Sequence, residues 1–188
     1  MSGNDAQRSH AQPRLQSQPR SQSRAKDTGP PLTGADEKAT LRGFLDHLRN
    51  AVADKVEGVP EPQVRTGGVP SGTNLLGLVK HLAFVERFYF LGEDVGDWLT
   101  TMRPTAEDTV ASVLADYRKT VERANQVIDA CPDLALPAPR PPRRGQAPSM
   151  RWVLVHMVEE TGRLPTRQSP GSLGSAPWWP VGRVDRRT

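Results

Sequence analysis

Two histidines and one glutamate are the residues whose types and spacing suit chemistry in this sequence. His156 and Glu160 lie four positions apart in SMRWVLVHMVEETGR, so on a helix both project from one face, one turn apart. Imidazole and carboxylate are ligands that suit zinc, nickel or iron. His81, in NLLGLVKHLAFVERFYFLGE, would complete a three-ligand metal site from a facing helix. A simple helix ion pair and a packed core histidine explain the same pattern without a metal.

Four segments with helical spacing of apolar residues must position these side chains. We expect helices over residues 36–56, from 73 or 74 to 91, from about 105 to 131, and from 149 until Pro165 ends the last one. Asn74 and Ser149 are N-cap candidates, and the run T-A-E-D at 105–108 resembles a displaced capping box. No segment has a strand signal, so the predicted fold class is all-α, a four-helix bundle.

Residues 132–148 contain six prolines and should form an extended segment that crosses between the last two helices. Arg140, Arg143 and Arg144 make this segment basic. We expect a solvated loop there, and binding of an anionic substrate group is the alternative.

The basic charge of the chain belongs to its ends. Residues 1–35 carry five Lys and Arg against two Asp and Glu, and residues 164–188 carry four against one. The remaining residues, 36–163, carry 16 against 18, although the whole chain has a net charge of +4. A nucleic-acid-binding fold would carry its basic stripe on the folded part, so nucleic acid is not the expected partner.

The composition divides the chain into three parts. Residues 1–35 are rich in Ser, Gln, Arg and Pro and almost lack large apolar side chains, so we predict a disordered tail. Residues 36–163 should be the bundle, and residues 164–188 an atypical tail. One cysteine, Cys131, allows no intramolecular disulfide and fits a reducing cytoplasm. No run of about twenty apolar residues predicts a membrane span.

Three stretches give the sequence a family resemblance. DEKATLRGFLDHLRNAV, VPSGTNLLGLVKHLAFVERFYF and SMRWVLVHMVEETGR resemble the actinobacterial branch of the DinB/YfiT superfamily. That branch includes mycothiol-dependent maleylpyruvate isomerases and thiol S-transferases. The resemblance implies a divalent metal held by a histidine on the second helix and two ligands one turn apart on the fourth.

The sequence departs from this implied ligand set at one position. His81 matches the first ligand and Glu160 the second, but the third position is Leu164, and Pro165 follows. Leucine cannot coordinate a metal, which leaves His156 as a substitute third ligand or as a residue that orients one. Residues 164–188 have the composition of GC-rich DNA read out of frame, so a frameshifted gene end and a genuine disordered tail are the two alternatives.

The leading functional hypothesis is therefore a metal-dependent thiol S-transferase or isomerase with impaired activity. In the related proteins the metal would bind a low-molecular-weight thiol and lower its pKa, so that the thiolate attacks an electrophile. The alternative is a non-enzymatic or degenerate bundle, a metal-free scaffold or homodimer. A third hypothesis, DNA binding through the basic tails, predicts salt-sensitive binding that is lost without residues 1–35. We expect Glu86, in the second helix, to be a packing residue at the bundle rim, and a hydrogen-bond partner to a metal ligand is the alternative.

Overall fold

A computed structural model describes residues 29–67, 73–140 and 147–166, with side chains up to residue 163. Most of the predicted N-terminal tail and nearly all of the atypical tail lie outside these described residues. The predictions of disorder and of a frameshift therefore remain predictions.

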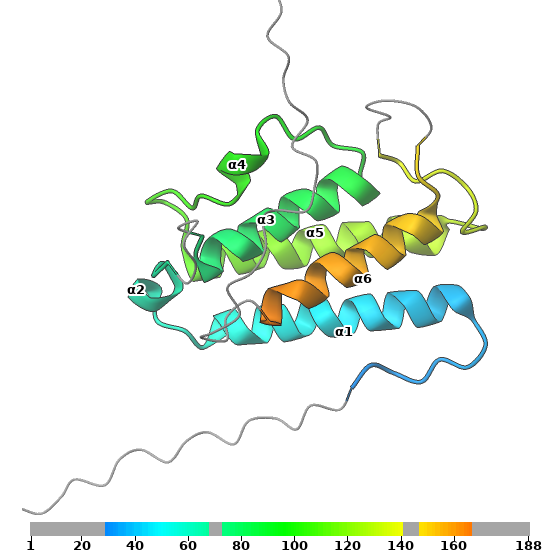
Figure 1. The fold of residues 1–188 in the computed structure, drawn as a ribbon, viewed down its shortest axis with the longest axis horizontal. Helices are drawn as coiled ribbons and strands as arrows, with labels where there is room; N and C mark the ends of the chain where they lie inside the picture. The colour runs from blue at the N-terminus through cyan, green and yellow to red at the C-terminus, as the bar shows by residue number, and fades with distance from the viewer. Residues whose placement is uncertain (1–28, 68–72, 141–146, 167–188) are drawn as a thin grey trace, which may run out of the picture.

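Four long helices form the described part of the chain: α1 (Glu37–Glu57), α3 (Leu75–Phe90), α5 (Val110–Ala130) and α6 (Met150–Thr166). They lie side by side as a bundle (Figure 1), and two short helices, α2 (Glu61–Val64) and α4 (Trp98–Thr101), lie in the connections. The described ranges contain no strand, only one isolated bridge between Pro137 and Ser149. The predicted all-α class is confirmed.

The helix starts follow local capping chemistry. Asp36 accepts a hydrogen bond from the Ala39 amide at 3.0 Å, and Asn74 accepts one from the Gly77 amide at 2.8 Å, so each satisfies an amide that has no partner inside its helix. The Ser149 hydroxyl accepts from the Trp152 amide at 3.3 Å. The predicted caps at Asn74 and Ser149 are thus confirmed.

Two predicted helix boundaries were wrong. The third long helix begins at Val110, where Thr109 and Ser112 form a reciprocal capping box. Asp108 instead accepts from the Thr105 amide at 2.6 Å, so T-A-E-D folds as a turn before the helix. The last helix continues through Pro165 to Thr166, because a proline near a helix end removes only one hydrogen bond.

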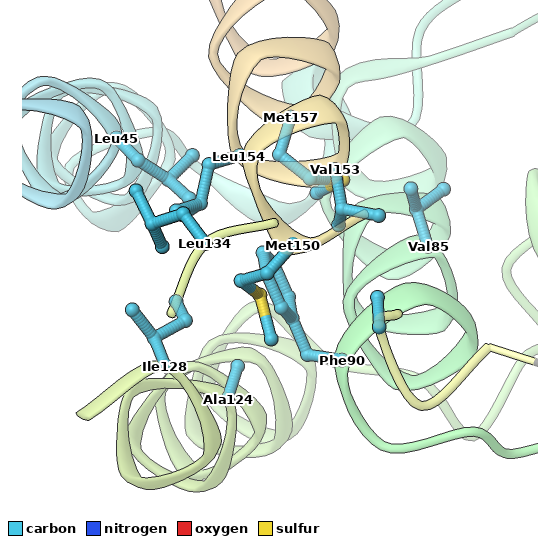
Figure 2. Close-up of a cluster of buried hydrophobic side chains, with 11 residues drawn as sticks. Leu45, Val85, Phe90, Ala124, Ile128, Leu134, Met150, Val153, Leu154 and Met157 are labelled. Atoms are coloured by element: carbon cyan, nitrogen blue, oxygen red, sulfur yellow. The ribbon is translucent and has the colours of Figure 1, made fainter. Parts of the chain in front are cut away.

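Neighbouring helices of the bundle meet along two extensive and two smaller interfaces. α3 packs most extensively on α5, and α1 on α6, whereas the seams between α1 and α5 and between α3 and α6 have fewer contacts. Figure 2 shows Leu45, Phe90, Ile128 and Leu154, one from each long helix, pointing into a common apolar interior. A second buried cluster, which includes Val56, fills the other end of α1.

The described parts of the proline-rich crossing segment, residues 132–140 and 147–148, pack against the bundle, whereas Arg143 and Arg144 lie outside the described residues. Leu134 and Ala138 are 6% and 5% exposed. The Leu136 and Leu134 carbonyls accept hydrogen bonds from the Met150 and Arg151 amides at 2.8 and 2.9 Å. These two amides lie in the first turn of α6 and have no partner inside the helix, so the crossing segment caps α6.

No helix in the described ranges has the length and apolar character needed to cross a membrane. Cys131 is the C-cap residue of α5. Its thiol donates to the Asp133 carbonyl at 3.2 Å, and its side chain packs partly buried against the apolar cluster of Figure 2. Its surroundings are those of a packing residue.

Candidate functional site

His81 lies inside the bundle on α3 and is 2% exposed. Its Nδ1 is 2.7 Å from the Thr101 hydroxyl, which also donates to the Trp98 carbonyl at 2.6 Å. A hydroxyl has one hydrogen, so Thr101 accepts from His81 and Nδ1 carries the proton. Nε2 is therefore the nitrogen with the lone pair. A partner that fixes the tautomer in this way is typical of histidines that ligate metals.

The short helix α4 holds this arrangement against α3. Trp98 presents its ring to His81 in an edge-to-face contact, with ring centroids 5.8 Å apart. At Gly77 of α3 an added Cβ would overlap the Met102 carbonyl oxygen, so only glycine allows this close approach. Burial lowers the pKa of His81 to about 4, and the imidazole is neutral near pH 7.

His156 lies on α6 within a group of aromatic rings. It stacks on Trp152 with centroids 4.9 Å apart and meets the edge of Tyr89 at 5.0 Å. Burial is the main cause that lowers its pKa; Glu159 opposes the shift, and the positive charge of Arg140 adds to it. Glu160, one turn further along α6, is half-buried.

A continuous series of ring contacts connects the two histidines across the seam between α3 and α6. Its members are, in order, His81, Trp98, Phe88, Tyr89 and His156. The guanidinium carbon of Arg140 lies over the Phe88 and Tyr89 rings, 5.0 and 5.3 Å from their centroids. The expectation of a solvated loop was therefore wrong for Arg140, because cation–π contacts hold it on the bundle.

The donors in the described residues do not complete a metal site. Within these ranges no three His, Cys, Asp or Glu side chains come together in a way that could hold a metal ion. His81 belongs to α3, whereas His156 and Glu160 belong to α6, and His156 is engaged with aromatic rings. The side chain of Leu164 lies outside the described residues, and leucine offers no donor atom.

A buried ion pair joins α1 to α3, and the sequence did not predict its pairing. Arg49 of α1 and Glu86 of α3 are 2% and 0% exposed. They form a two-pronged ion pair with Nε–Oε1 and Nη2–Oε2 distances of 2.7 and 2.6 Å. Arg49 also donates through Nη1 to Asp46 at 2.8 Å and to Asn125 of α5 at 2.9 Å. The expectation that Glu86 lies at the rim was wrong.

The electrostatics of this pair favour the charged guanidinium of Arg49. Burial by itself would lower the pKa of Arg49, but the charge and hydrogen bonds of Glu86 outweigh burial and raise it. Burial and the negative charge of Glu86 both raise the pKa of the neighbouring Tyr117. One signal in the sequence pointed to the pair, because Arg49 falls on the apolar face of its helix, between Leu45 and Val52.

Comparison with known proteins gives one family match. The family model for mycothiol-S-transferase matches residues 40–163, which run from the first turn of α1 through α5 and along α6 as far as Arg163. No curated protein and no solved structure matches the chain. The matched residues are about two thirds of the chain and include nearly all of the helical bundle up to the position before Leu164. The chain therefore belongs to the mycothiol S-transferase family, a DinB/YfiT-like family of helical bundles.

Proposed function

We propose that this protein is a thiol S-transferase or isomerase of the mycothiol type whose metal-dependent activity is impaired. The observation that carries the proposal is the orientation of His81, whose Nδ1 lies 2.7 Å from the Thr101 hydroxyl, because a hydrogen bond to one ring nitrogen orients the imidazole in histidines that ligate metals. The family match supports a low-molecular-weight thiol as one substrate and an electrophile as the other.

The impairment follows from the donor set. His81 and Glu160 supply two donors from helices that contact each other, but position 164 is leucine. His156 is the remaining nearby imidazole, and its stacking on Trp152 opposes a move into a ligand position. We infer that the chain retains zinc, nickel or iron weakly.

His81 cannot replace the metal as an activator of the thiol. Its pKa of about 4 lies far below the ordinary thiol value of about 8.5. Proton transfer from thiol to imidazole would therefore be strongly uphill. Deprotonation of the thiol by His81 alone adds this cost to the barrier, which supports weak activity.

Restoring the missing donor tests the proposal. Purified full-length chain, Leu164→His, and Leu164→His with His81→Ala would be loaded with zinc, dialysed and analysed for metal. Thiol transfer to an electrophilic chromophore would be measured on the same samples. We expect little retained zinc in the original chain, about one equivalent and faster transfer in Leu164→His, and loss of both in the double variant. Leu136→His places a histidine on an exposed position and should change neither.

Two results would contradict this reasoning. If the original chain keeps one equivalent of zinc and Leu164→His adds nothing, the site is complete and the activity is not impaired. If Leu164→His binds no zinc, position 164 is not the third ligand and the alignment of the chain with its family's ligand set is wrong.

The second candidate is a metal-free helical scaffold. It is favoured by the incomplete donor set of the described residues and by apolar side chains on the outer side of α1 and α6. Phe44, Trp152 and Val155 are 44%, 49% and 52% exposed, which would suit a homodimer. Sedimentation of the chain and of Val155→Glu tests it: a dimer that becomes a monomer, with no zinc and no thiol transfer in either, supports the scaffold. A cytoplasmic location remains part of both proposals.

A further inference from the structure

The crossing segment fixes the backbone of one arginine against the end of α3. Gly92, in the turn after α3, has a φ of 68°, and a Cβ added there would lie 2.7 Å from the Pro139 carbonyl oxygen. The Ala138 amide donates to the Pro148 carbonyl at 2.8 Å, which ties the two described parts of the segment to each other. Arg140 follows Pro139 directly, so its side chain starts from a fixed position on the bundle.

The guanidinium of Arg140 lies over two rings of α3. Its central carbon is 5.0 Å from the ring centroid of Phe88 and 5.3 Å from that of Tyr89. Such contacts use the charge and the flat face of the guanidinium and leave its N–H donors for other partners. Two parallel N–H groups of an arginine match the two oxygens of a carboxylate.

No counter-ion within the described ranges neutralises Arg140. Other arginines of the bundle pair with carboxylates, as Arg151 does with Glu37. Arg140 has no ion pair or hydrogen bond with a group in these ranges, although its Nε is buried. Withdrawing a charge from water without a partner is unfavourable, and ring contacts offset that cost only in part. This combination favours an anion that comes from outside the chain.

An approaching anion can reach this charge. Arg140 is partly exposed, and Nε alone among its three nitrogens is buried without a partner, so the two Nη groups remain accessible. The charge also acts on its surroundings: burial is the main cause that lowers the pKa of His156, and the positive charge of Arg140 adds to that shift. Glu159, which opposes the shift, is already paired with Arg163.

Trp152 of α6 adds an aromatic surface beside Tyr89. It is 49% exposed, and its ring centroid lies 6.2 Å from that of Tyr89. The ring of His156 stacks on Trp152 with centroids 4.9 Å apart, which fixes the orientation of the indole. A ligand ring that stacks on the exposed part of the indole would gain an aromatic contact in addition to its buried area.

We propose that Arg140, Tyr89 and Trp152 form a binding site for a planar aromatic carboxylate. The ligand carboxylate accepts hydrogen bonds from the Nη groups of Arg140, and the ligand ring stacks on Trp152. A neutral aromatic molecule would lack the ion pair, and an aliphatic carboxylate would lack the stacking. The site requires no metal, so its occupation and the retention of zinc are separate questions.

Titration of the isotope-labelled, metal-free full chain tests this proposal by NMR. The probe is benzoate, and the comparisons are benzamide, which keeps the ring without the charge, cyclohexanecarboxylate, which keeps the charge without the aromatic ring, and sulfate. The signal to follow is the indole N–H of Trp152, which Trp152→Leu identifies by its loss. We expect benzoate to shift this signal saturably, and the three comparison molecules to bind several-fold more weakly.

Two substitutions in the site should weaken benzoate binding by different factors. Arg140→Gln should weaken it about tenfold to a hundredfold, the range for hydrogen bonds to a charged group. Trp152→Leu, followed through backbone amide signals, should weaken it about twofold to tenfold. The matched controls Arg103→Gln and Phe44→Leu change an exposed arginine and an exposed aromatic residue elsewhere, and they should bind benzoate as the original chain does.

Thermal unfolding of each variant checks that it is folded, and Arg140→Lys, which keeps the charge but not the planar pair of donors, is the second variant if Arg140→Gln does not fold. The proposal is overturned if benzoate gives no saturable shift, or if benzamide, cyclohexanecarboxylate or sulfate binds as tightly as benzoate. It is equally overturned if the folded Arg140 variant binds benzoate unchanged, or if the control variants lose as much affinity as the site variants.

Discussion

Replacing one member of the buried Arg49–Glu86 pair should destabilise the bundle strongly, whereas replacing both should not. The pair joins α1 to α3 through the interior, with both side chains at most 2% exposed. Glu86→Leu leaves a buried guanidinium, and Arg49→Met leaves a buried carboxylate. The double variant leaves neither charge, and it fills the same space with apolar atoms.

The structure sets the size of the effect. Removing one partner of a buried pair costs about 3–5 kcal/mol. Glu86→Leu should fall at the lower end, because Arg49 keeps its 2.8 Å hydrogen bond to Asp46, whose side chain is 31% exposed. Arg49→Met should fall at the upper end, because Glu86 is 0% exposed. In the double variant Asn125 still donates to Asp46 at 3.2 Å, so its stability should lie within about 2 kcal/mol of the original chain.

Urea unfolding at pH 7, followed by circular dichroism, measures all four free energies of the cycle. A matched surface cycle uses Arg151→Met and Glu37→Gln, since Arg151 also holds its glutamate with two hydrogen bonds, at 2.7 and 3.0 Å, but in solvent. Its coupling should be too small to resolve. Two results would refute the claim that the pair is desolvated and mutually dependent. One is that the losses in free energy of unfolding are additive in the buried cycle, and the other is that Glu86→Leu costs less than about 1 kcal/mol.

Three further predictions concern single positions. Gly77→Ala should lower the midpoint of thermal unfolding, because the added Cβ would overlap the Met102 carbonyl oxygen. Gly162→Ala is the control: its Cβ would lie an ordinary 3.6 Å from the nearest neighbouring atom, and the change should raise the free energy of unfolding by up to about 1 kcal/mol. Equal effects of the two substitutions would contradict the close approach of α4. In metal-free protein the His81 contribution to stability should be complete above about pH 6.5 and lost as pH falls toward 4, since its folded pKa is depressed to about 4 and the unfolded chain binds the proton first. The free energy of unfolding of His81→Gln should therefore depend less steeply on pH. An unchanged pH dependence in this variant would argue against the burial of His81. Thr109→Ala should cost about 1 kcal/mol in urea unfolding by removing the cap of α5, and a neutral result would show that the capping box does not stabilise the helix.

Local sequence patterns were enough to predict the bundle. The three-and-four spacing of apolar residues identified all four long helices, and the caps at Asn74 and Ser149 were read from residue type alone. Capping depends on a side chain and a backbone amide two or three residues away, so a cap can be predicted from the residue types of a short segment. The start of α5 was misplaced because Thr105 and Thr109 both suit a cap, and only the turn made by Asp108 selects the second.

The candidate site depended on contacts between distant residues. The apolar face of α1 told which way Arg49 points, but not that Glu86, 37 positions away, would meet it. Likewise the residue type of His81 indicated metal chemistry, whereas its tautomer is fixed by Thr101, 20 positions away. Helical periodicity specifies the direction of a side chain and contains no information on its partner. The sequence by itself therefore determined the helices and the identity of the candidate donors. The packing of α3, α4 and α6 decided how those donors are oriented and which of them come together.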